Sequence, residues 1–353
     1  MKVLGIESSC DETAVGIVEN GWCLLSNAVA SSMDLHAQYG GVVPEIAARS
    51  HIEVVIPVIQ QALQDAACSW SDIDAIAVTQ GAGLNGGLLV GVLTARTLAI
   101  VTGKPLYAVN HVEGHIYANF LTKTPLPGYH LRAKQPAFPM LGVIVSGGHS
   151  QLVLWRGHFD YTLLGQTQDD AIGEAFDKVA KIIGLPYPGG INVSHKATEG
   201  DAHAYQLPKA RLSGKYDFSF SGVKTAVLRL AQEQVGKDYS LPSSALRGLL
   251  SETQKANIAA VFQRVACETI VDKVLLAYDE FRPTSIVIGG GVAANTELRR
   301  QLGERLPLPI EYLDLKLCGD NGAMIATLGY YQAVHSLKPA NPYTLETVPN
   351  LSM

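Results

Sequence analysis

The chain has little of several features that define whole classes of proteins. Its five cysteines lie at positions 10, 23, 68, 267 and 318 and form no Cys-x-x-Cys pair, which argues against zinc-ribbon and thioredoxin-like sites. An odd number at wide spacing is typical of a reduced protein. No stretch reaches the roughly 18 continuous apolar residues of a membrane helix, and the start lacks the apolar run of a signal peptide. We expect a soluble cytoplasmic protein, or one of an organellar matrix or stroma after removal of a transit peptide.

Charge is also scarce, at 17% of residues against 47% hydrophobic ones. This composition favours a sizeable core and argues against disorder. The net charge of −5 implies no nucleic-acid partner globally, so RNA binding would need a local basic surface or a partner subunit. Residues 178–229 contain eight Lys or Arg against three acids, with Tyr205, Tyr216, Phe218 and Phe220 between them. A basic surface with aromatics suits RNA, although a solvated basic face explains the pattern equally well.

The length of 353 residues suggests about two domains or one duplicated fold. Apolar strands are predicted over 2–7 and 13–19 around a polar turn, and again over 140–145 and 151–155 around a Ser-Gly-Gly turn. This strand–turn–strand unit repeats, which indicates two related α/β halves.

Other segments show the patterns of helices and strands. Further strands are predicted over 22–30, 73–79, 106–109 and 284–288. Helices are predicted over 44–67 with a kink at Pro57, over a stretch of small residues that ends at about 101, over 171–183 and over 243–281. Two more helices are predicted to begin at about 295 and after 322. The segment from 187 to about 220, the loop 123–139 and the tail from His335 are expected to be irregular.

Two histidines, His111 and His115, follow one predicted strand. Their i, i+4 spacing places both on one face of a helical turn, where two imidazoles can bind one metal ion. Such a pair is also common on a helix surface without metal. The metallopeptidase signature His-Glu-x-x-His is absent, because Val112 occupies the second position and Glu113 the third, which argues against peptidase chemistry.

Two turns have residues that suit anion binding or proton transfer. The glycines of Ser146-Gly147-Gly148-His149 let backbone N–H groups approach a phosphate. The turn of residues 8–12 is its counterpart, and its Asp11 and Glu12 suit general-base work as well as solvation. Two ordinary β-turns would give the same pattern. No Gly-x-Ser-x-Gly elbow exists, which argues against a serine hydrolase.

Two later segments carry glycine or acidic residues at predicted helix starts. The glycines of residues 289–291 permit close approach of a flat nucleoside, and Asn295 is either a helix N-cap or a contact to a nucleoside. The pattern is not Gly-x-Gly-x-x-Gly, so a dinucleotide site is disfavoured. Asp320 is either a helix cap or a carboxylate directed into a site.

Taken together, these motifs resemble one family. They are Gly5-Ile6-Glu7-Ser8-Ser9-Cys10-Asp11-Glu12-Thr13, Gly40 to Glu45, His111 to His115, Val145 to His149, Asp169-Asp170 with Gly173 to Lys178, Tyr187 to Gly190, Phe218 to Gly222, Gly290 to Asn295 and Asp320-Asn321-Gly322. Their order over about residues 1–335 is similar to that of the TsaD (Kae/Gcp/YgjD) family of tRNA threonylcarbamoyladenosine transferases.

The resemblance implies an actin-like, sugar-kinase-like ATPase (ASKHA) fold of two duplicated α/β domains with a cleft between them. We expect an N-terminal domain of residues 1–109 plus about 325–353, and a C-terminal domain of 110–324 that carries most donor and metal contacts. A small-molecule kinase or ATPase of the same fold is the alternative function, and a non-catalytic RNA-binding scaffold is a further one.

The resemblance also implies a reaction. The threonylcarbamoyl group of threonylcarbamoyl-AMP is transferred to the N6 amine of the adenosine 3′ of the anticodon, in tRNAs that read codons beginning with A. One divalent metal ion per subunit is implied on His111, His115 and Asp320, with Fe²⁺ as the expected ion and Zn²⁺ as the alternative. The donor contacts carried over are Ile144, Val145, Ser146, Gly147, Gly148, Asp177, Gly190 and Asn295. Asp11 is our candidate for the proton acceptor.

The family further implies tRNA as a partner, together with a TsaB-like paralogous subunit and a TsaE-like small ATPase. Three positions depart from the family pattern. Gly81-Ala82-Gly83 replaces Gly-Pro-Gly, Gly319 replaces a threonine before Asp320, and Ile191 replaces a proline after Gly190. None of these changes removes an implied ligand.

Overall fold

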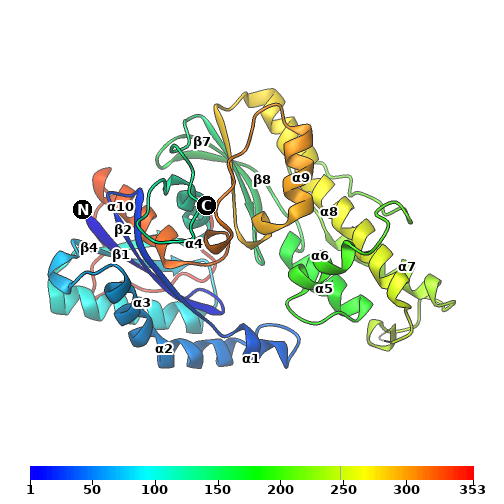
Figure 1. Ribbon diagram of the computed structural model, residues 1–353, viewed down its shortest axis with the longest axis horizontal. Coiled ribbons are helices and arrows are strands. Elements are labelled where there is room, and N and C mark those ends of the chain that lie inside the picture. Colours follow the sequence, from blue (N-terminus) through cyan, green and yellow to red (C-terminus); the bar gives the residue numbers. More distant parts are fainter. Residues whose placement is uncertain (247) are drawn as a thin grey trace. The chain divides into compact units, whose positions relative to one another are not determined.

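The computed structural model describes residues 1–246 and 248–353 and contains two compact α/β units (Figure 1). The first unit contains Met1–Ala137, Val287–Gly289 and Glu311–Met353, and the second contains Phe138–Ile286 and Gly290–Ile310. These limits differ from the domain limits that the sequence predicts, which lie at 109/110 and about 324/325. Residues 111–117 join the first unit because their helix, α4 (His111–Tyr117), packs against α10 (Gly322–Val334).

The first unit is built on a five-stranded sheet of order β3-β2-β1-β4-β5. Its strands are β1 (Lys2–Glu7), β2 (Glu12–Glu19), β3 (Cys23–Ser31), β4 (Ala75–Gly81) and β5 (Leu106–Asn110). Strands β1, β2 and β3 are antiparallel neighbours, whereas β4 runs parallel to both β1 and β5. The predicted strand–turn–strand at the start of the chain is confirmed.

The two faces of this sheet bury different residues of β1, as the period of two along a strand requires. Leu4 and Ile6 join the apolar core that includes α2 (Pro44–Asp65) and α3 (Asn85–Thr102), which lie together along the sheet in Figure 1. The short α1 (Met33–Ala37) precedes them. Pro57 lies inside α2, so the predicted helix continues through it.

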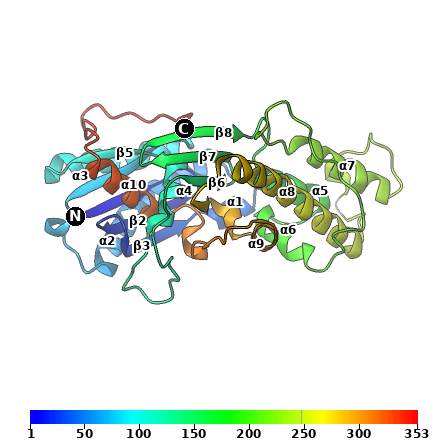
Figure 2. The ribbon, with the colours of Figure 1, turned by 90° about the horizontal axis from the view of Figure 1, so that it is seen from above.

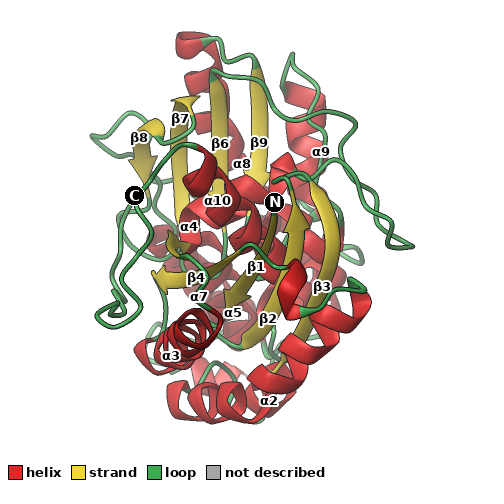
Figure 3. Ribbon diagram, turned by 90° about the vertical axis from the view of Figure 1, so that its left-hand side faces the viewer, coloured by secondary structure: helices red, strands yellow, loops and turns green. Residues whose placement is uncertain are grey.

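Helix α10 lies directly on the backbone of the sheet's other face (Figure 3). Gly5 and Gly16 are register partners in β1 and β2. A Cβ atom on Gly5 would lie 2.3 Å from the backbone N of Ala326, and one on Gly16 would lie 2.4 Å from the N of Ala323. Only glycine permits such an approach, and it fixes the start of α10 against the strands that lead into the first turn.

Helix α3 is the only helix among the described residues that is long and apolar enough to cross a membrane, with 33% of its residues buried. The sequence prediction of no membrane-length segment therefore has this one exception by length and hydropathy. Its buried side chains, such as Leu88 and Val92, pack in the core of the first unit. Core helices of soluble proteins have the same composition.

The second unit repeats the pattern of the first. Its sheet has the order β8-β7-β6-β9, with β6 (Met140–Val145), β7 (Ser150–Gly157), β8 (Asp160–Gln166) and β9 (Ser285–Gly289). The last three residues of β9 belong to this sheet by their pairing, although their contacts group them with the first unit. The helices are α5 (Ile172–Ile183), α6 (Gly189–Ala197), α7 (Ser221–Gln234), α8 (Glu252–Phe281) and α9 (Thr296–Arg305). Figure 2 shows β6, β7 and β8 side by side, with α5 and α8 beyond their ends. The antiparallel strands β6–β8 correspond to β1–β3, so the predicted duplication is confirmed.

Some elements of this unit differ from the prediction. Helix α6 lies within the segment expected to be irregular, and α7 follows it. The long helix begins at Glu252 rather than 243, because Ser251 and Gln254 form a capping box there. Short 3₁₀ turns complete the fold at Trp70–Asp72, Ala118–Phe120, Ser243–Leu246, Gly291–Ala294 and Leu315–Leu317.

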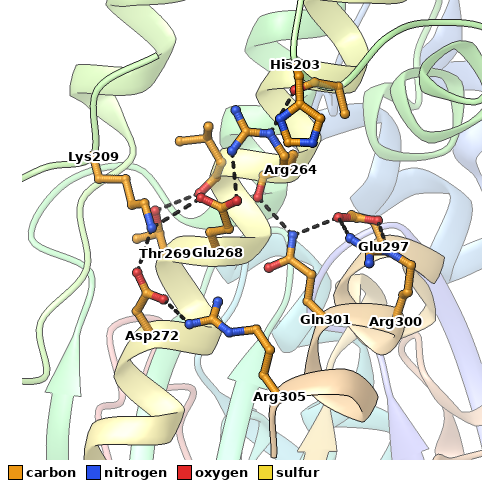
Figure 4. A network of polar contacts seen from close by, with 12 residues as sticks. His203, Lys209, Arg264, Glu268, Thr269, Asp272, Glu297, Arg300, Gln301 and Arg305 are labelled. Atoms are coloured by element: carbon orange, nitrogen blue, oxygen red, sulfur yellow. Dashed lines mark hydrogen bonds and ion pairs between the residues drawn. The ribbon is translucent and has the colours of Figure 1, made fainter. Parts of the chain in front are cut away.

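Charged side chains connect α9 to the long helix α8 (Figure 4). Arg305 contacts Asp272 at 2.6 Å, and Gln301 donates to the carbonyl of Arg264 at 3.1 Å. Arg264 in turn pairs with Glu268 at 2.8 Å. These partly exposed pairs fix the register of the two helices more than they add stability.

Candidate functional site

The two histidines lie on one face of α4, as their spacing predicts. Asn110 caps this helix, since its side-chain oxygen accepts a hydrogen bond from Val112 N at 2.8 Å. The imidazole rings of His111 and His115 are 4.7 Å apart between centroids, and both side chains are buried. Their Nε2 atoms lie 3.6 Å and 3.4 Å, respectively, from Oδ1 of Asp320.

Asp320 is a carboxylate directed at the histidines and not the cap of α10. The cap is its neighbour Asn321, whose side chain accepts from Met324 N at 2.9 Å and donates to the Gly319 carbonyl at 2.9 Å. A Cβ atom at Gly319 would meet nothing within 4 Å, so this turn has room for the threonine of the family pattern as well as for glycine. The ligand atoms of His111, His115 and Asp320 all lie within 4.8 Å of one another.

A buried carboxylate that sequence reasoning missed orients one histidine. Glu7 Oε2 accepts a hydrogen bond from His111 Nδ1 at 2.9 Å and another from the Thr79 hydroxyl at 2.6 Å. Its other oxygen accepts from Ser9 N at 2.5 Å. With the Nδ1 hydrogen used in this way, the Nε2 atom of His111 is turned toward Asp320 and is the atom available to a metal ion. A carboxylate behind a histidine is the usual support of a metal ligand.

The site holds more negative than positive charge. Burial alone would raise the pKa of Glu7, but the charge and hydrogen bond of His111 outweigh it and lower that pKa to about 2. For His111, burial opposes the charged form, yet Asp320 and Glu7 raise the pKa to about 9. Burial raises the pKa of Asp320 to about 6, and the charges of Glu7 and Asp11 add to this effect. A cation at this position would relieve the repulsion.

The donor set therefore fits a divalent metal ion. Two imidazoles and one carboxylate are the ligands that Zn²⁺ and non-haem Fe²⁺ accept, with positions left for substrate or water. The group is buried, its ligand atoms converge, and Glu7 provides the outer support. These observations support a metal at this place without selecting between iron and zinc.

The first turn places further acidic residues beside this group. Asp11 and Glu12 are half-buried at its tip. Burial together with the charges of Asp320 and Asp11 raises the pKa of Glu12 to about 9. Burial and the neighbouring carboxylates also raise the pKa of the Cys10 thiol, which argues against a thiolate nucleophile. Buried His51 supports the turn, since its Nε2 donates to the Cys10 carbonyl at 3.0 Å.

The second predicted turn lies in the second unit, at the end of β6. Ser146 N donates to the His149 carbonyl at 2.8 Å, which closes the hairpin, and Gly147 and Gly148 are exposed at its tip. A Cβ atom on Gly290, whose φ is +97°, would lie 2.4 Å from the Val145 carbonyl oxygen. The glycine loop after β9 therefore approaches the turn after β6 as closely as backbones allow.

The remaining predicted donor contacts also belong to the second unit. Asp177 Oδ1 accepts from Gly189 N at 2.7 Å and so holds the start of α6, where a Cβ on Gly190 would meet nothing within 4 Å. Asn295 is the N-cap of α9, because its oxygen accepts from Leu298 N at 3.0 Å. Its amide nitrogen donates to Ser194 and Gln263, so the structure favours the capping role among the two interpretations of Asn295.

The structure thus brings the predicted residues together in two groups. The metal ligands and Asp11 belong to the first unit, and residues 144–148, Asp177, Gly190 and Asn295 belong to the second. This grouping differs from the sequence prediction, in which the metal ligands and most donor contacts share the C-terminal domain of residues 110–324. Glu7, Ser9, Thr79 and His51 were missed as supporting residues. Among these residues, only Glu7 could have been recognised from the sequence, because it lies at the end of a predicted strand and functional groups gather at the strand ends of a sheet.

Known proteins resemble this chain over most of its length. A family model described as TsaD, tRNA N6-adenosine threonylcarbamoyltransferase, matches residues 23–327. A protein of that name from Thermomicrobium roseum is 48% identical over 345 residues, 96% of this chain and 93% of the relative. One from Desulfitobacterium hafniense is 46% identical over 357 residues, 100% of this chain and 98% of the relative.

Among solved structures, full-length HypF in its phosphate- and nucleotide-bound form matches 95% of this chain and 56% of its own, with a TM-score of 0.58 and 12% identity. This likeness concerns the fold alone. Together with the two related sheets, it confirms the predicted actin-like, sugar-kinase-like ATPase fold. From the full-length relatives and the matching family model, the chain belongs to the TsaD family, the tRNA N6-adenosine threonylcarbamoyltransferases.

Proposed function

We propose that this enzyme transfers the threonylcarbamoyl group of threonylcarbamoyl-AMP to N6 of the adenosine 3′ of the anticodon, in tRNAs that read codons beginning with A. Family membership gives the transferase activity on tRNA, and the convergence of His111, His115 and Asp320 supports a metal-dependent reaction. In the reaction, the N6–C bond forms and the bond from the carbamoyl carbon to the phosphate oxygen breaks. AMP leaves with the bonding electrons, and the amine loses one proton.

An aromatic amine is a weak nucleophile, so the protein must contribute mainly by positioning and by stabilising negative charge on oxygen. His111, His115 and Asp320 would hold the divalent ion, which when bound supplies Lewis acidity and a template for the donor. Glu7 keeps the His111 ring in the orientation that this role needs, through the 2.9 Å hydrogen bond. Fe²⁺ is the ion we expect, with Zn²⁺ as the alternative.

We assign the donor to the residues of the second hairpin and its neighbours. The exposed amides of Gly147 and Gly148 suit phosphate or carbonyl oxygens. Asp177 is our candidate for the ribose hydroxyls, and the contact of Asn295 with the nucleoside stays a prediction. Ile144 and Val145 continue the same strand, and Gly190 follows the Asp177–Gly189 contact. Asp11 remains our candidate for the proton acceptor, because its carboxylate is half-buried in the turn between β1 and β2.

The expected partners follow from the family and from charge. Because this chain has a net charge of −5, a second subunit that adds positive charge would strengthen its binding to RNA. We therefore propose a TsaB-like paralogous subunit and a TsaE-like small ATPase as the proteins with which it works.

A direct test is to incubate the protein with threonylcarbamoyl-AMP and unmodified tRNA, with and without these partners, and to measure the mass of the tRNA nucleosides. We expect the threonylcarbamoylated adenosine together with released AMP. A kinase or ATPase of the same fold would leave the tRNA mass unchanged and would instead consume ATP.

The His111→Ala variant tests the metal role, with His130→Ala as a matched control at an exposed position. We expect His111→Ala to fold, to lose bound metal by elemental analysis and to lose transfer. The control should keep both. Unchanged turnover in His111→Ala would remove the metal ligands from the mechanism.

A further inference from the structure

The basic stretch of residues 178–229 is much less available to RNA than its sequence suggests. Five of its eight cations pair with carboxylates, namely Lys178, Lys196, Lys209, Lys215 and Lys224. Figure 4 shows one such case, Lys209 between Glu268 and Asp272. Three of the four aromatics, Tyr216, Phe218 and Phe220, are buried, so they offer no stacking surface for bases.

What remains is a cavity between α5 and α7. It measures about 310 Å³ and is lined by Lys178, Lys181, Ile182, Lys224, Thr225, Leu228 and Ser243. Three ammonium groups, from both helices, therefore surround one space. The apolar members form its walls, and Ser243 brings a hydroxyl from the segment before α8.

Two of the three lysines are fixed in place by one carboxylate. Asp170 accepts from Lys178 Nζ at 2.7 Å through Oδ1 and from Lys224 Nζ at 2.6 Å through Oδ2. The Asp170 side chain is only 13% exposed, so it acts as an internal anchor that directs both ammonium groups. Lys224 has two further hydrogens to donate, whereas Lys178, which also pairs with Glu174 at 2.7 Å, has one.

The charges around the cavity leave a surplus. Three lysines face Asp170 and Glu174, the latter bonded to Lys178 at 2.7 Å, so one positive charge is uncompensated. Among the described residues, no carboxylate pairs with Lys181, which is exposed at the rim. One surplus charge with several N–H donors matches one phosphodiester, the singly charged unit of an RNA backbone.

A second basic side chain continues this surface along α7. Arg229 lines a neighbouring cavity of about 540 Å³, which shares Thr225 with the first. Its guanidinium lies 5.6 Å from the ring centroid of Tyr239, a residue that is 68% exposed. The exposed cationic side chains of this region therefore come from both helices, Lys181 from α5 and Arg229 from α7.

We propose that the cavity between α5 and α7, with Lys181 at its rim and Lys178 and Lys224 inside it, binds a backbone phosphate of the tRNA substrate. This inference rests on the proposed function, because it takes tRNA as the partner. A phosphate contact carries no sequence information, so it contributes affinity and orientation for every tRNA alike.

The test compares Lys181→Ala with Lys209→Ala in tRNA-binding titrations at several salt concentrations. Both variants remove one positive charge from the same unit, but Lys209 is already held by two carboxylates. For Lys181→Ala we expect the Kd for tRNA to rise about threefold to tenfold, with the slope of log K against log salt reduced by about one. Lys181→Arg should restore binding, and Lys209→Ala should bind as the unchanged protein does.

Two results would overturn the inference. The first is an unchanged Kd and salt slope in Lys181→Ala. The second is a raised KM for threonylcarbamoyl-AMP with unchanged tRNA binding, which would assign the cavity to the phosphate of the small donor. Failure of the unaltered protein to transfer the group to tRNA would instead refute the proposed function. That result is separately visible in the nucleoside masses.

Discussion

His111 Nδ1 donates a hydrogen bond of 2.9 Å to Oε2 of Glu7, the last residue of β1, and both side chains are buried. The two residues are 104 positions apart in the chain and meet because β1 and β5 both flank β4. The bond fixes the tautomer of one predicted metal ligand. Glu7 is therefore a positioning residue for the metal site, one step removed from the ion itself.

Glu7→Gln should weaken metal binding without unfolding the protein. The amide keeps the volume of the side chain but removes the charge that holds the His111 hydrogen, so we expect metal affinity to fall about tenfold to a hundredfold. The measurement is a metal titration of the chelator-treated protein, with circular dichroism to verify the fold. Glu53→Gln, at an exposed position of α2, is the control. Equal affinity in both variants would show that Glu7 does not support the site.

Asn321→Ala should destabilise the turn that carries Asp320. Asn321 is fully buried, caps α10 and donates to the carbonyls of Leu317 and Gly319. Loss of a cap together with unsatisfied buried carbonyls should lower the free energy of unfolding by about 2 kcal/mol or more. Urea denaturation measures the change. Asn341→Ala, which removes a turn contact to Tyr343 N at an exposed site, should cost less than about 1 kcal/mol.

Gly290→Ala tests the close approach of the two loops in the second unit. The φ of +97° disfavours alanine, and its Cβ would lie 2.4 Å from the Val145 carbonyl oxygen. We expect a loss of more than about 2 kcal/mol in unfolding free energy, with weaker binding of an AMP analogue.

Gly291→Ala is the matched control for this prediction, because a Cβ there would meet nothing within 4 Å and its φ lies outside the positive range. Stability and nucleotide binding close to those of the parent protein are expected. Equal losses in both variants would mean that the loop tolerates no side chain at all, whatever the approach to Val145.

Local patterns were sufficient to predict much of the fold. The alternation around the two polar turns predicted β1, β2, β6 and β7, because one side of each strand must reach a core. The spacing of His111 and His115 predicted their shared face, since helix geometry alone decides it. Asp320 joined them through the family resemblance, and no local pattern distinguished a cap from a ligand there.

Non-local contacts explain what the sequence did not predict. Glu7 meets His111 only through the strand order of the sheet, which no nearby residue encodes. Helix α6 begins at Gly189 beside a proline and a second glycine, residues that normally mark a turn. It is held by its packing on α5 and α8, so tertiary contacts override the local preference.

Arg96→Gln should release the tail that crosses the first unit. The Arg96 guanidinium donates to the carbonyls of Pro342, Tyr343 and Leu345 at 2.6, 2.8 and 3.2 Å. Glutamine cannot reach all three, so we expect faster proteolysis near these residues and an unfolding free energy lower by about 1–2 kcal/mol. Arg282→Gln, at an exposed ion pair with Asp279, should change neither. A tail equally resistant in both variants would contradict the anchoring role.

Asp170→Asn should lower stability in a pH-dependent way. Burial would raise the pKa of Asp170, but hydrogen bonds from Lys178 and Lys224 outweigh it and hold the pKa below its usual value of 3.8. Because the folded-state pKa is the lower one, this carboxylate stabilises the fold fully above about pH 4, and the stabilisation is lost as pH falls through the folded pKa. Urea denaturation should therefore show a deficit of about 1–3 kcal/mol for the variant at pH 7, and the two proteins should converge as the pH falls below the folded-state pKa of Asp170. Glu304→Gln, at an exposed pair with Arg300, should show almost no deficit at either pH. A deficit for Asp170→Asn that stayed constant down to low pH would show that lost packing, and not the charge, explains it.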